Sequence, residues 1–237
     1  MKPVLVAFAL SFAGLPALAQ GTPPADAPAV TKANTATPPN ASDLLFEEPQ
    51  MKNVAPGSTL TYAYLRRSGI SKGPFGPTMD DQIKLSIEPG GAPENRTIRV
   101  QMFSGANRFP AGPFNDMPGN PVMTLFLEHH LIDLAKVLSA NPRYIKNGIR
   151  KALRDNATVT ATTATVKGQT VDAWRVEVQP FLDDKMKVRM RGLENLKYTF
   201  VTSPAVPGEL LSIEAQSKTA DGGELLQENL TYDPNAG

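Results

Sequence analysis

Both histidines of the chain lie side by side, in the stretch LEHHLIDLAK at residues 127–136. His129 and Asp133 are four residues apart, a spacing that places two metal ligands or an acid–base pair on one side of a helix. A catalytic zinc ion usually takes three protein ligands, and the chain has no further histidine to supply the third. We therefore expect no metal and no cofactor. A hydrogen bond from His129 to Asp133 explains the pair as well, and a metal-dependent hydrolase that uses these two residues is our third hypothesis of function.

Other chemistry is sparse in the sequence. There is no cysteine, which excludes disulfides and a thiol nucleophile. The Ser-x-x-Lys pair, the His-Glu-x-x-His zinc motif and the phosphate-binding Gly-x-x-x-x-Gly-Lys loop are all absent. Paired acids at 80–81 and 183–184 lack the alternating oxygen ligands of a calcium loop. The sequence favours a protein that is not an enzyme.

The histidines belong to a segment with helical periodicity, residues 122–140. Its main apolar stripe consists of Met123, Leu127, His130, Leu134 and Leu138, with Phe126 and Leu131 at its margins. Because His130 lies on this stripe, we predict a neutral core imidazole that makes one or two hydrogen bonds. Leu125 and Ile132 point the opposite way, so we expect the helix to be covered on two sides.

A second, basic helix is predicted after it. Asn141 is placed as its N-cap and Pro142 as its first residue, which is a strong start signal. One broad face carries five cations, and the other carries apolar side chains such as Ile145 and Ile149. The basic face is either a solvated surface or a contact for phospholipid head groups or an acidic partner protein. Its residues are Arg143, Lys146, Arg150, Lys151 and Arg154.

Most of the remaining chain alternates apolar and polar residues, the pattern of strands with one buried face. Three such strands fall within residues 59–102, and six follow within 158–232, one of them in DKMKVRMRG at 184–192. KG at 167–168 and DGG at 221–223 are short enough to be hairpin turns. We predict an α+β fold with one large, curved, half-barrel-like antiparallel sheet of about nine strands. Two helices are inserted between strands three and four and pack on its concave face.

The N-terminus predicts export. Lys2, an apolar run at residues 4–15 and the stretch ALA at residues 17–19 before Gln20 form the pattern of a cleavable signal peptide, residues 1–19. Residues 20–43 are rich in Pro, Ala and Thr and read as a disordered linker, followed by one folded domain at 44–237. Without Lys2 the chain has 23 basic and 23 acidic residues, which gives no argument for nucleic acid. We expect a periplasmic or secreted bacterial protein with no lipobox cysteine and no transmembrane helix.

The strand run 59–102, the helices 122–155 and the strands 158–232 together resemble the periplasmic lipoprotein carriers of the Lol type and related half-barrel lipid-binding proteins. The resemblance is one of architecture and assigns no role to any residue. It implies a protein that shields an apolar ligand between its sheet and its helices.

Our leading hypothesis is a non-enzymatic exported protein that binds a lipid-like ligand between sheet and helices. A solid core without a pocket is the competing interpretation of the same apolar residues. The second hypothesis is a module of the cell envelope that docks a partner protein or an anionic membrane surface. The predicted ligand-binding residues are Met123, Phe126, Leu127, Leu131, Leu134, Leu138, Trp174, Val176 and Val178.

Overall fold

The computed structural model describes residues 37–69, 75–219 and 221–236. The chain divides into two units, Met1–Lys32 and Ala33–Gly237, and all the described residues belong to the second. The signal-peptide prediction and most of the linker prediction therefore lie outside the described residues. The first well-buried side chains of the described residues are Ala41 and Leu45. Ala41 lies just before the short helical segment η1, Asp43–Glu47, and Leu45 lies within it.

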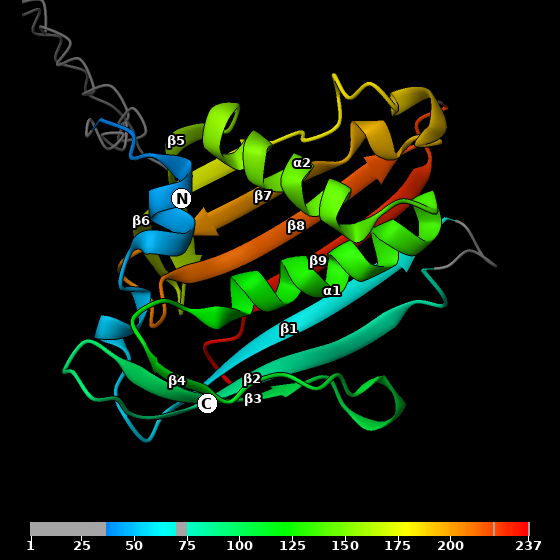
Figure 1. Ribbon diagram of the computed structural model, residues 1–237. Coiled ribbons are helices and arrows are strands. Elements are labelled where there is room, and N and C mark those ends of the chain that lie inside the picture. The colour runs from blue at the N-terminus through cyan, green and yellow to red at the C-terminus, as the bar shows by residue number, and fades with distance from the viewer. Residues whose placement is uncertain (1–36, 70–74, 220, 237) are drawn as a thin grey trace, which may run out of the picture. The chain divides into compact units, whose positions relative to one another are not determined.

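The described unit is α+β, with a single nine-stranded antiparallel sheet that does not close into a barrel. Two helices, α1 and α2, cover one face of the sheet (Figure 1). The elements are β1 (Thr59–Ser68), β2 (Met79–Pro89), β3 (Arg96–Met102), β4 (Phe114–Met117), α1 (Pro121–Leu138), α2 (Pro142–Asp155), β5 (Thr158–Val166), β6 (Gln169–Val178), β7 (Lys197–Thr202), β8 (Leu210–Lys218) and β9 (Glu224–Tyr232), with short helical turns η2 (Gln50–Asn53), η3 (Gly105–Asn107), η4 (Lys187–Arg189) and η5 (Leu193–Asn195).

The strand order explains why the helices lie across the sheet. The order is β4-β3-β2-β1-β9-β8-β7-β6-β5, so two runs of sequential neighbours are joined by the pairing of β1 with β9. The edge strands β4 and β5 are consecutive strands in the sequence but lie at opposite edges of the sheet. The α1–α2 segment connects these edges by passing over the sheet face, which brings both helices onto it (Figure 1).

The fold class is confirmed, with two differences in detail. A short fourth strand, β4, forms in the Gly/Pro-rich loop before α1, so the helices lie between strands four and five. The predicted strand at 184–192 is absent, because β6 pairs directly with β7 and leaves it no place in the sheet. Two of its apolar residues, Met186 and Val188, are instead exposed, at 39% and 91%. These two differences cancel, and the count of nine strands is unchanged.

The predicted start of α2 at Asn141 and the predicted hairpin turn at 167–168 are confirmed, and α1 begins with a cap of the same type. Asn120 caps α1 by accepting a hydrogen bond from the Val122 amide, 3.1 Å away, and Asn141 caps α2 through the Arg143 amide at 2.9 Å. Lys167 and Gly168 both have positive φ, 49° and 78°, as the tight hairpin between β5 and β6 requires. Among the described residues, no helix has the length and hydropathy needed to span a bilayer.

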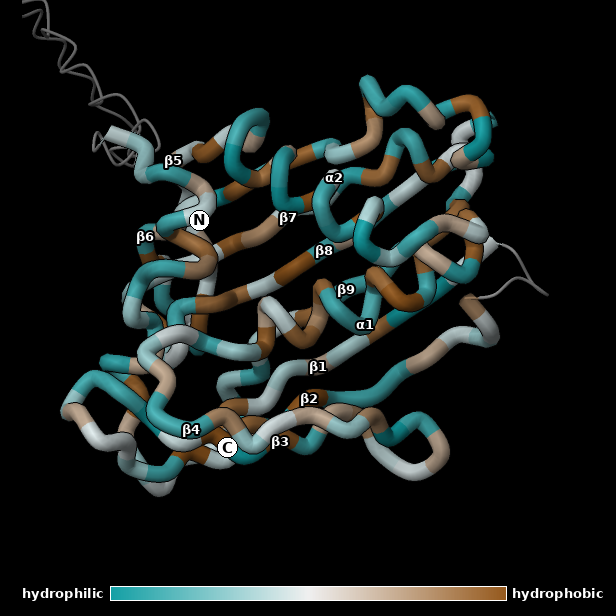
Figure 2. Tube along the Cα trace, viewed as in Figure 1, coloured by the Kyte–Doolittle hydropathy of each residue, from teal (hydrophilic) through white to brown (hydrophobic). Residues whose placement is uncertain are grey.

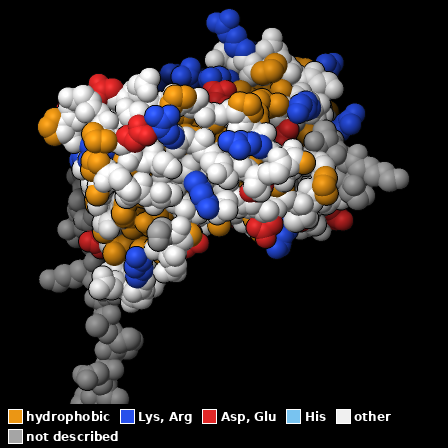
Figure 3. Space-filling view, turned by 90° about the horizontal axis from the view of Figure 1, so that it is seen from below, with side chains coloured by type: hydrophobic (Ala, Val, Ile, Leu, Met, Phe, Trp, Pro, Cys, Tyr) orange, Lys and Arg blue, Asp and Glu red, His pale blue; other side chains and the backbone are white. Residues whose placement is uncertain are grey.

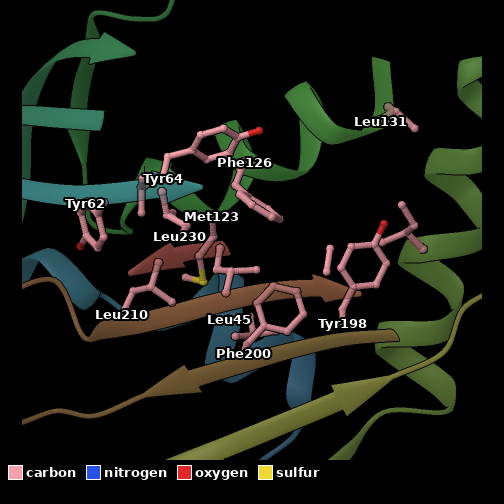
Figure 4. Close-up of a cluster of buried hydrophobic side chains, with 14 of the residues drawn as sticks. Leu45, Tyr62, Tyr64, Met123, Phe126, Leu131, Tyr198, Phe200, Leu210 and Leu230 are labelled. Carbon is pink, nitrogen blue, oxygen red and sulfur yellow. The ribbon is translucent and has the colours of Figure 1, made fainter. Parts of the chain in front are cut away.

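The core lies between the sheet and the helices. Hydrophobic residues recur along the strands that lie beneath α1 and α2 (Figure 2), and the side chains of Tyr62, Tyr64, Met123, Phe126 and Phe200 meet in the core (Figure 4). All five are at most 1% exposed. The layer between sheet and helices is therefore filled by side chains at this point.

Candidate functional site

The predicted ligand-binding residues separate into two groups. Met123, Phe126 and Leu134 on α1, with Val176 and Val178 on β6, are buried in the continuous hydrophobic core and are at most 3% exposed. Leu138 packs on this core from the end of α1 and is only partly buried, as is Trp174 on β6. All of these residues except Trp174 pack in or against the core between the sheet and the helices.

Leu127 and Leu131 behave differently, because they line a pocket. The pocket has a volume of about 490 Å³ and lies between η1, α1 and α2. It falls within the roughly 300–1,000 Å³ typical of small-molecule sites. Its lining is Ser42, Phe46 and Glu47 from the N-terminal segment, Thr124, Leu127, Glu128 and Leu131 from α1, and Lys146, Ile149, Arg150, Leu153 and Arg154 from α2.

The floor of the pocket is apolar. Leu131, Ile149 and Leu153 line it although they are only 3–5% exposed, and they join the pocket to the hydrophobic core beneath. Phe46 borders it from η1 and is 37% exposed. Helical periodicity places these residues together, because Leu127 and Leu131 are one turn apart on α1, as are Ile149 and Leu153 on α2.

The rim of the pocket is charged, with three basic residues, Lys146, Arg150 and Arg154, and two acidic residues, Glu47 and Glu128. Lys146 forms a salt bridge with Glu128, which links α2 to α1 across the pocket. Arg154 pairs with Asp155 at 2.9 Å, on its own helix. Arg150 is exposed and makes no salt bridge with any residue in the described part of the chain. Its guanidinium is therefore free to bind an anion at the edge of an apolar cavity.

Of the five predicted head-group residues, Lys146, Arg150 and Arg154 thus border the pocket. Arg143 and Lys151 are exposed on α2 but do not line it. The division of α2 into a basic outer face and an apolar inner face is confirmed, with Ile145, Ile149, Ala152 and Leu153 buried.

A buried polar cluster fixes α1 to the sheet. His130 is fully buried and its Nδ1 lies 2.6 Å from Oε2 of Glu228 on β9, while the Tyr64 hydroxyl donates to Oε1 at 2.7 Å. The core position and the hydrogen bond predicted for His130 are confirmed. Burial raises the pKa of Glu228, but the charge of His130 and the hydrogen bonds from His130 and Tyr64 outweigh it, and the pKa lies below its ordinary value.

The tyrosine hydroxyls near this cluster stay protonated. Burial, reinforced by the charge and hydrogen bond of Glu228, raises the pKa of Tyr64 far above its ordinary range, and burial does the same for Tyr198. The Tyr198 ring contacts the His130 ring edge-on, with centroids 5.5 Å apart. Neither Nε2 of His130 nor the Tyr198 hydroxyl has a hydrogen-bond partner within the described ranges.

Sequence reasoning missed Glu228. It occupies an inward position of β9 between Leu226 and Leu230, so the strand alternation alone places a carboxylate in the core. An inward acid on an apolar strand face, together with a histidine on the apolar stripe of a helix, is a signal for a buried pair.

His129 and Asp133 are not paired with each other. Asp133 accepts a hydrogen bond from Arg66 of β1 at 2.7 Å, and Nδ1 of His129 has no hydrogen-bond partner among the described residues. The His129 ring instead packs edge-on against Phe103 and Phe109, with centroids 5.0 and 5.5 Å away. Burial lowers the pKa of His129. The expected hydrogen bond from His129 to Asp133 is wrong. The hydrolase hypothesis required these two residues to act together, and they do not contact each other through a hydrogen bond.

One acid of each pair, Asp81 and Asp184, accepts hydrogen bonds from other residues of the protein. Asp81 accepts hydrogen bonds from Ser104 and Asn107, and Asp184 accepts one from the Tyr144 hydroxyl at 2.6 Å. No group of three or more His, Asp or Glu residues suited to a metal ion occurs in the part of the chain that the structure describes.

Comparisons with known proteins assign no family. No family model matches the chain, and no curated protein matches it. Among solved structures, the chain is similar to the Mycobacterium tuberculosis lipoprotein LppX, with a TM-score of 0.33 and 10% identity. The match covers 80% of this chain and 93% of that one. This is a weak likeness of architecture and carries no functional argument.

Proposed function

We propose that this protein is an exported, non-enzymatic binder of a single-chain anionic amphiphile, such as a fatty acid. The occupied site is the pocket between η1, α1 and α2. The single observation that carries the proposal is an apolar floor bordered by three cations, one of which, Arg150, has no acidic partner among the described residues.

The two parts of the pocket suit the two parts of such a molecule. Leu127, Leu131 and Leu153 offer an apolar surface to an alkyl chain, and each buried methylene contributes about 0.8 kcal/mol. Arg150 and Arg154 offer planar donors to a carboxylate, which guanidinium groups bind in a bidentate manner. An uncharged lipid would leave the basic rim unused.

The position of the site differs from the sequence-based hypothesis. That hypothesis placed the ligand between sheet and helices, where Met123, Phe126 and Leu134 now form filled core. The pocket lies beside that core, at the margin of the same apolar stripe of α1 and next to the N-terminal segment. The proposal keeps the chemistry of the earlier hypothesis and moves the ligand.

Mass spectrometry of an organic extract of the native protein tests the proposal without a chosen ligand. We expect a fatty acid or a related single-chain anion at up to one molecule per chain. A probe experiment follows with a fluorescent fatty acid, whose emission changes when it leaves water. Saturable binding that palmitate displaces supports the site, whereas an empty extract together with no probe binding at micromolar concentration overturns it.

A matched pair of variants locates the ligand. Leu131→Trp fills the pocket and should reduce probe affinity at least tenfold. Leu138→Trp introduces the same side chain on the same helix, outside the pocket lining, and should leave probe affinity within about twofold. Equal effects of the two substitutions would place the probe elsewhere.

A further inference from the structure

The segment between β6 and β7 gathers exposed apolar side chains. Among the described residues, six large hydrophobic side chains are classed as exposed, and three of them are Leu182, Met186 and Val188, at 43%, 39% and 91%. A fourth, Tyr144 at 42%, lies at the start of α2 and contacts the same segment through its hydrogen bond to Asp184. Soluble proteins rarely group such side chains at one place without a use for them.

The segment is anchored firmly at both ends. Phe181 is fully buried and packs against Gly148 of α2, where an added Cβ would come within 3.0 Å of its ring. Met190 and Leu193 are buried at the other end, at 3% and 1%. The Tyr144–Asp184 hydrogen bond holds the middle, and it raises the pKa of Tyr144 to about 12. The apolar tip is therefore held outward by its own buried ends.

Cations alternate with the apolar residues along this tip. Lys185, Lys187, Arg189 and Arg191 are all exposed, and none forms a salt bridge with a residue that the structure describes. Arg143 adds another exposed cation beside Tyr144. On the face shown in Figure 3, Lys and Arg side chains lie among hydrophobic side chains and a few Asp and Glu.

We propose that this basic apolar tip, residues 182–191 with Tyr144, docks the protein on an anionic phospholipid membrane. Exposed aliphatic side chains enter the boundary between head groups and acyl chains, and flanking Lys and Arg are attracted to anionic head groups. Charge complementarity selects the occupant, because a purely apolar partner would leave the unpaired cations unsatisfied. The docking surface is separate from the amphiphile pocket, although Lys146 of the pocket rim is two residues from Tyr144.

Vesicle co-sedimentation of the full chain tests the surface. Vesicles of phosphatidylcholine with 30% phosphatidylglycerol should bind the protein at 0.1 M salt, and vesicles of phosphatidylcholine alone should bind it at least tenfold less. Lys187→Gln with Arg189→Gln should lower the partition coefficient about 25-fold, because each basic residue near the surface contributes about a fivefold attraction. Val188→Asp should lower it about tenfold and leave fatty-acid binding unchanged.

The matched control removes the same charge elsewhere. Lys167→Gln with Arg175→Gln, two exposed cations of the β5–β6 hairpin, should change partition by less than twofold. Val188→Trp in a Trp174→Phe background places the single tryptophan of the chain at the tip. The fluorescence emission of this tryptophan should shift to shorter wavelength when anionic vesicles are added. Failure of the wild type to bind these vesicles, or equal losses in the control pair, overturns the proposal. Self-association that Val188→Asp abolishes, without vesicle binding, would assign the surface to a second copy of the chain.

Discussion

Two adjacent parts of the apolar stripe of α1 face different environments. The side facing the sheet carries Phe126, His130 and Leu134, all at most 1% exposed and packed against β-strand residues. The side facing η1 and α2 carries Leu127 and Leu131, which line a pocket of about 490 Å³. The sequence pattern alone does not distinguish the two groups of residues, because both belong to the same apolar stripe of the helix. The difference arises from what lies opposite: a wide sheet fills the space on one side, and a short turn and a narrow helix leave space on the other.

The buried pair on the sheet side gives the largest expected effect. Glu228→Ala should lower the free energy of unfolding by about 3–5 kcal/mol, because it leaves His130 buried without its partner. Urea denaturation followed by circular dichroism measures this. Glu224→Ala, at the exposed start of the same strand, is the control and should cost no more than about 0.5 kcal/mol. Similar costs would mean that the pair does not anchor α1.

Truncating one leucine on each side of α1 sharpens the comparison. Leu134→Ala should cost about 2–5 kcal/mol, because it opens a cavity in filled core. Leu131→Ala enlarges a space that already exists and should cost at least about 1 kcal/mol less. It should instead weaken binding of the fatty-acid probe. The reverse order of stability losses would place the open space on the sheet side.

Stability should fall as the pH is lowered. The pKa of His129 is depressed by burial, so the unfolded chain takes up a proton first as the pH drops below about 6.5, the ordinary value. The pKa of Glu228 is also depressed, and its contribution is lost as the pH falls below about 4.5 and through the lower folded value. Both changes have the same sign, so urea midpoints should decrease from pH 7 to pH 4.

One substitution separates the two contributions. His129→Phe keeps an aromatic ring against Phe103 and Phe109 and removes the titrating group. The decrease in urea midpoint between pH 6.5 and 5.5 should therefore become smaller. The decrease below pH 4.5 should remain. If the substitution leaves the pH dependence of the urea midpoint above pH 5 unchanged, protonation of His129 is not the cause of that decrease.

The smallest expected effect on stability belongs to the rim of the pocket. Arg150→Glu should change the free energy of unfolding by no more than about 0.5 kcal/mol, because the side chain is exposed and has no salt-bridge partner among the described residues. It should weaken fatty-acid binding about tenfold or more, the loss expected for a hydrogen bond between charged groups. Lys151→Glu, next to it but outside the pocket, is the control for charge. Equal weakening by both would mean that the pocket senses only overall charge.

Much of the fold followed from sequence patterns that act locally. Alternation predicted most of the strands, Asn141 and Pro142 predicted the start of α2, and a stripe at helical spacing placed His130 in the core. The strand predicted at 184–192 was wrong because alternation also arises where apolar residues are exposed between cations, as Val188 is. Strand order and pairing depend on distant contacts such as β1 with β9, which no local pattern encodes.

The candidate site was predicted in part. The head-group residues Lys146, Arg150 and Arg154 and the liners Leu127 and Leu131 were chosen from separate patterns, and the structure brings them to one pocket. The remaining liners were assigned to a ligand because burial in a core and burial against a ligand give the same apolar pattern. The contribution of Phe46 could not be predicted, since it depends on where the N-terminal segment crosses the helices.

The most direct test is a methyl NMR spectrum of leucine-labelled protein with a nitroxide-labelled stearate bound. The nitroxide broadens methyl signals near it, so the spectrum reports which side of α1 the ligand occupies. The pocket predicts stronger broadening of Leu127, Leu131 and Leu153 than of the core leucines Leu134, Leu210 and Leu230. Broadening of the core leucines, with the pocket leucines unaffected, would contradict the account and place the ligand between sheet and helices.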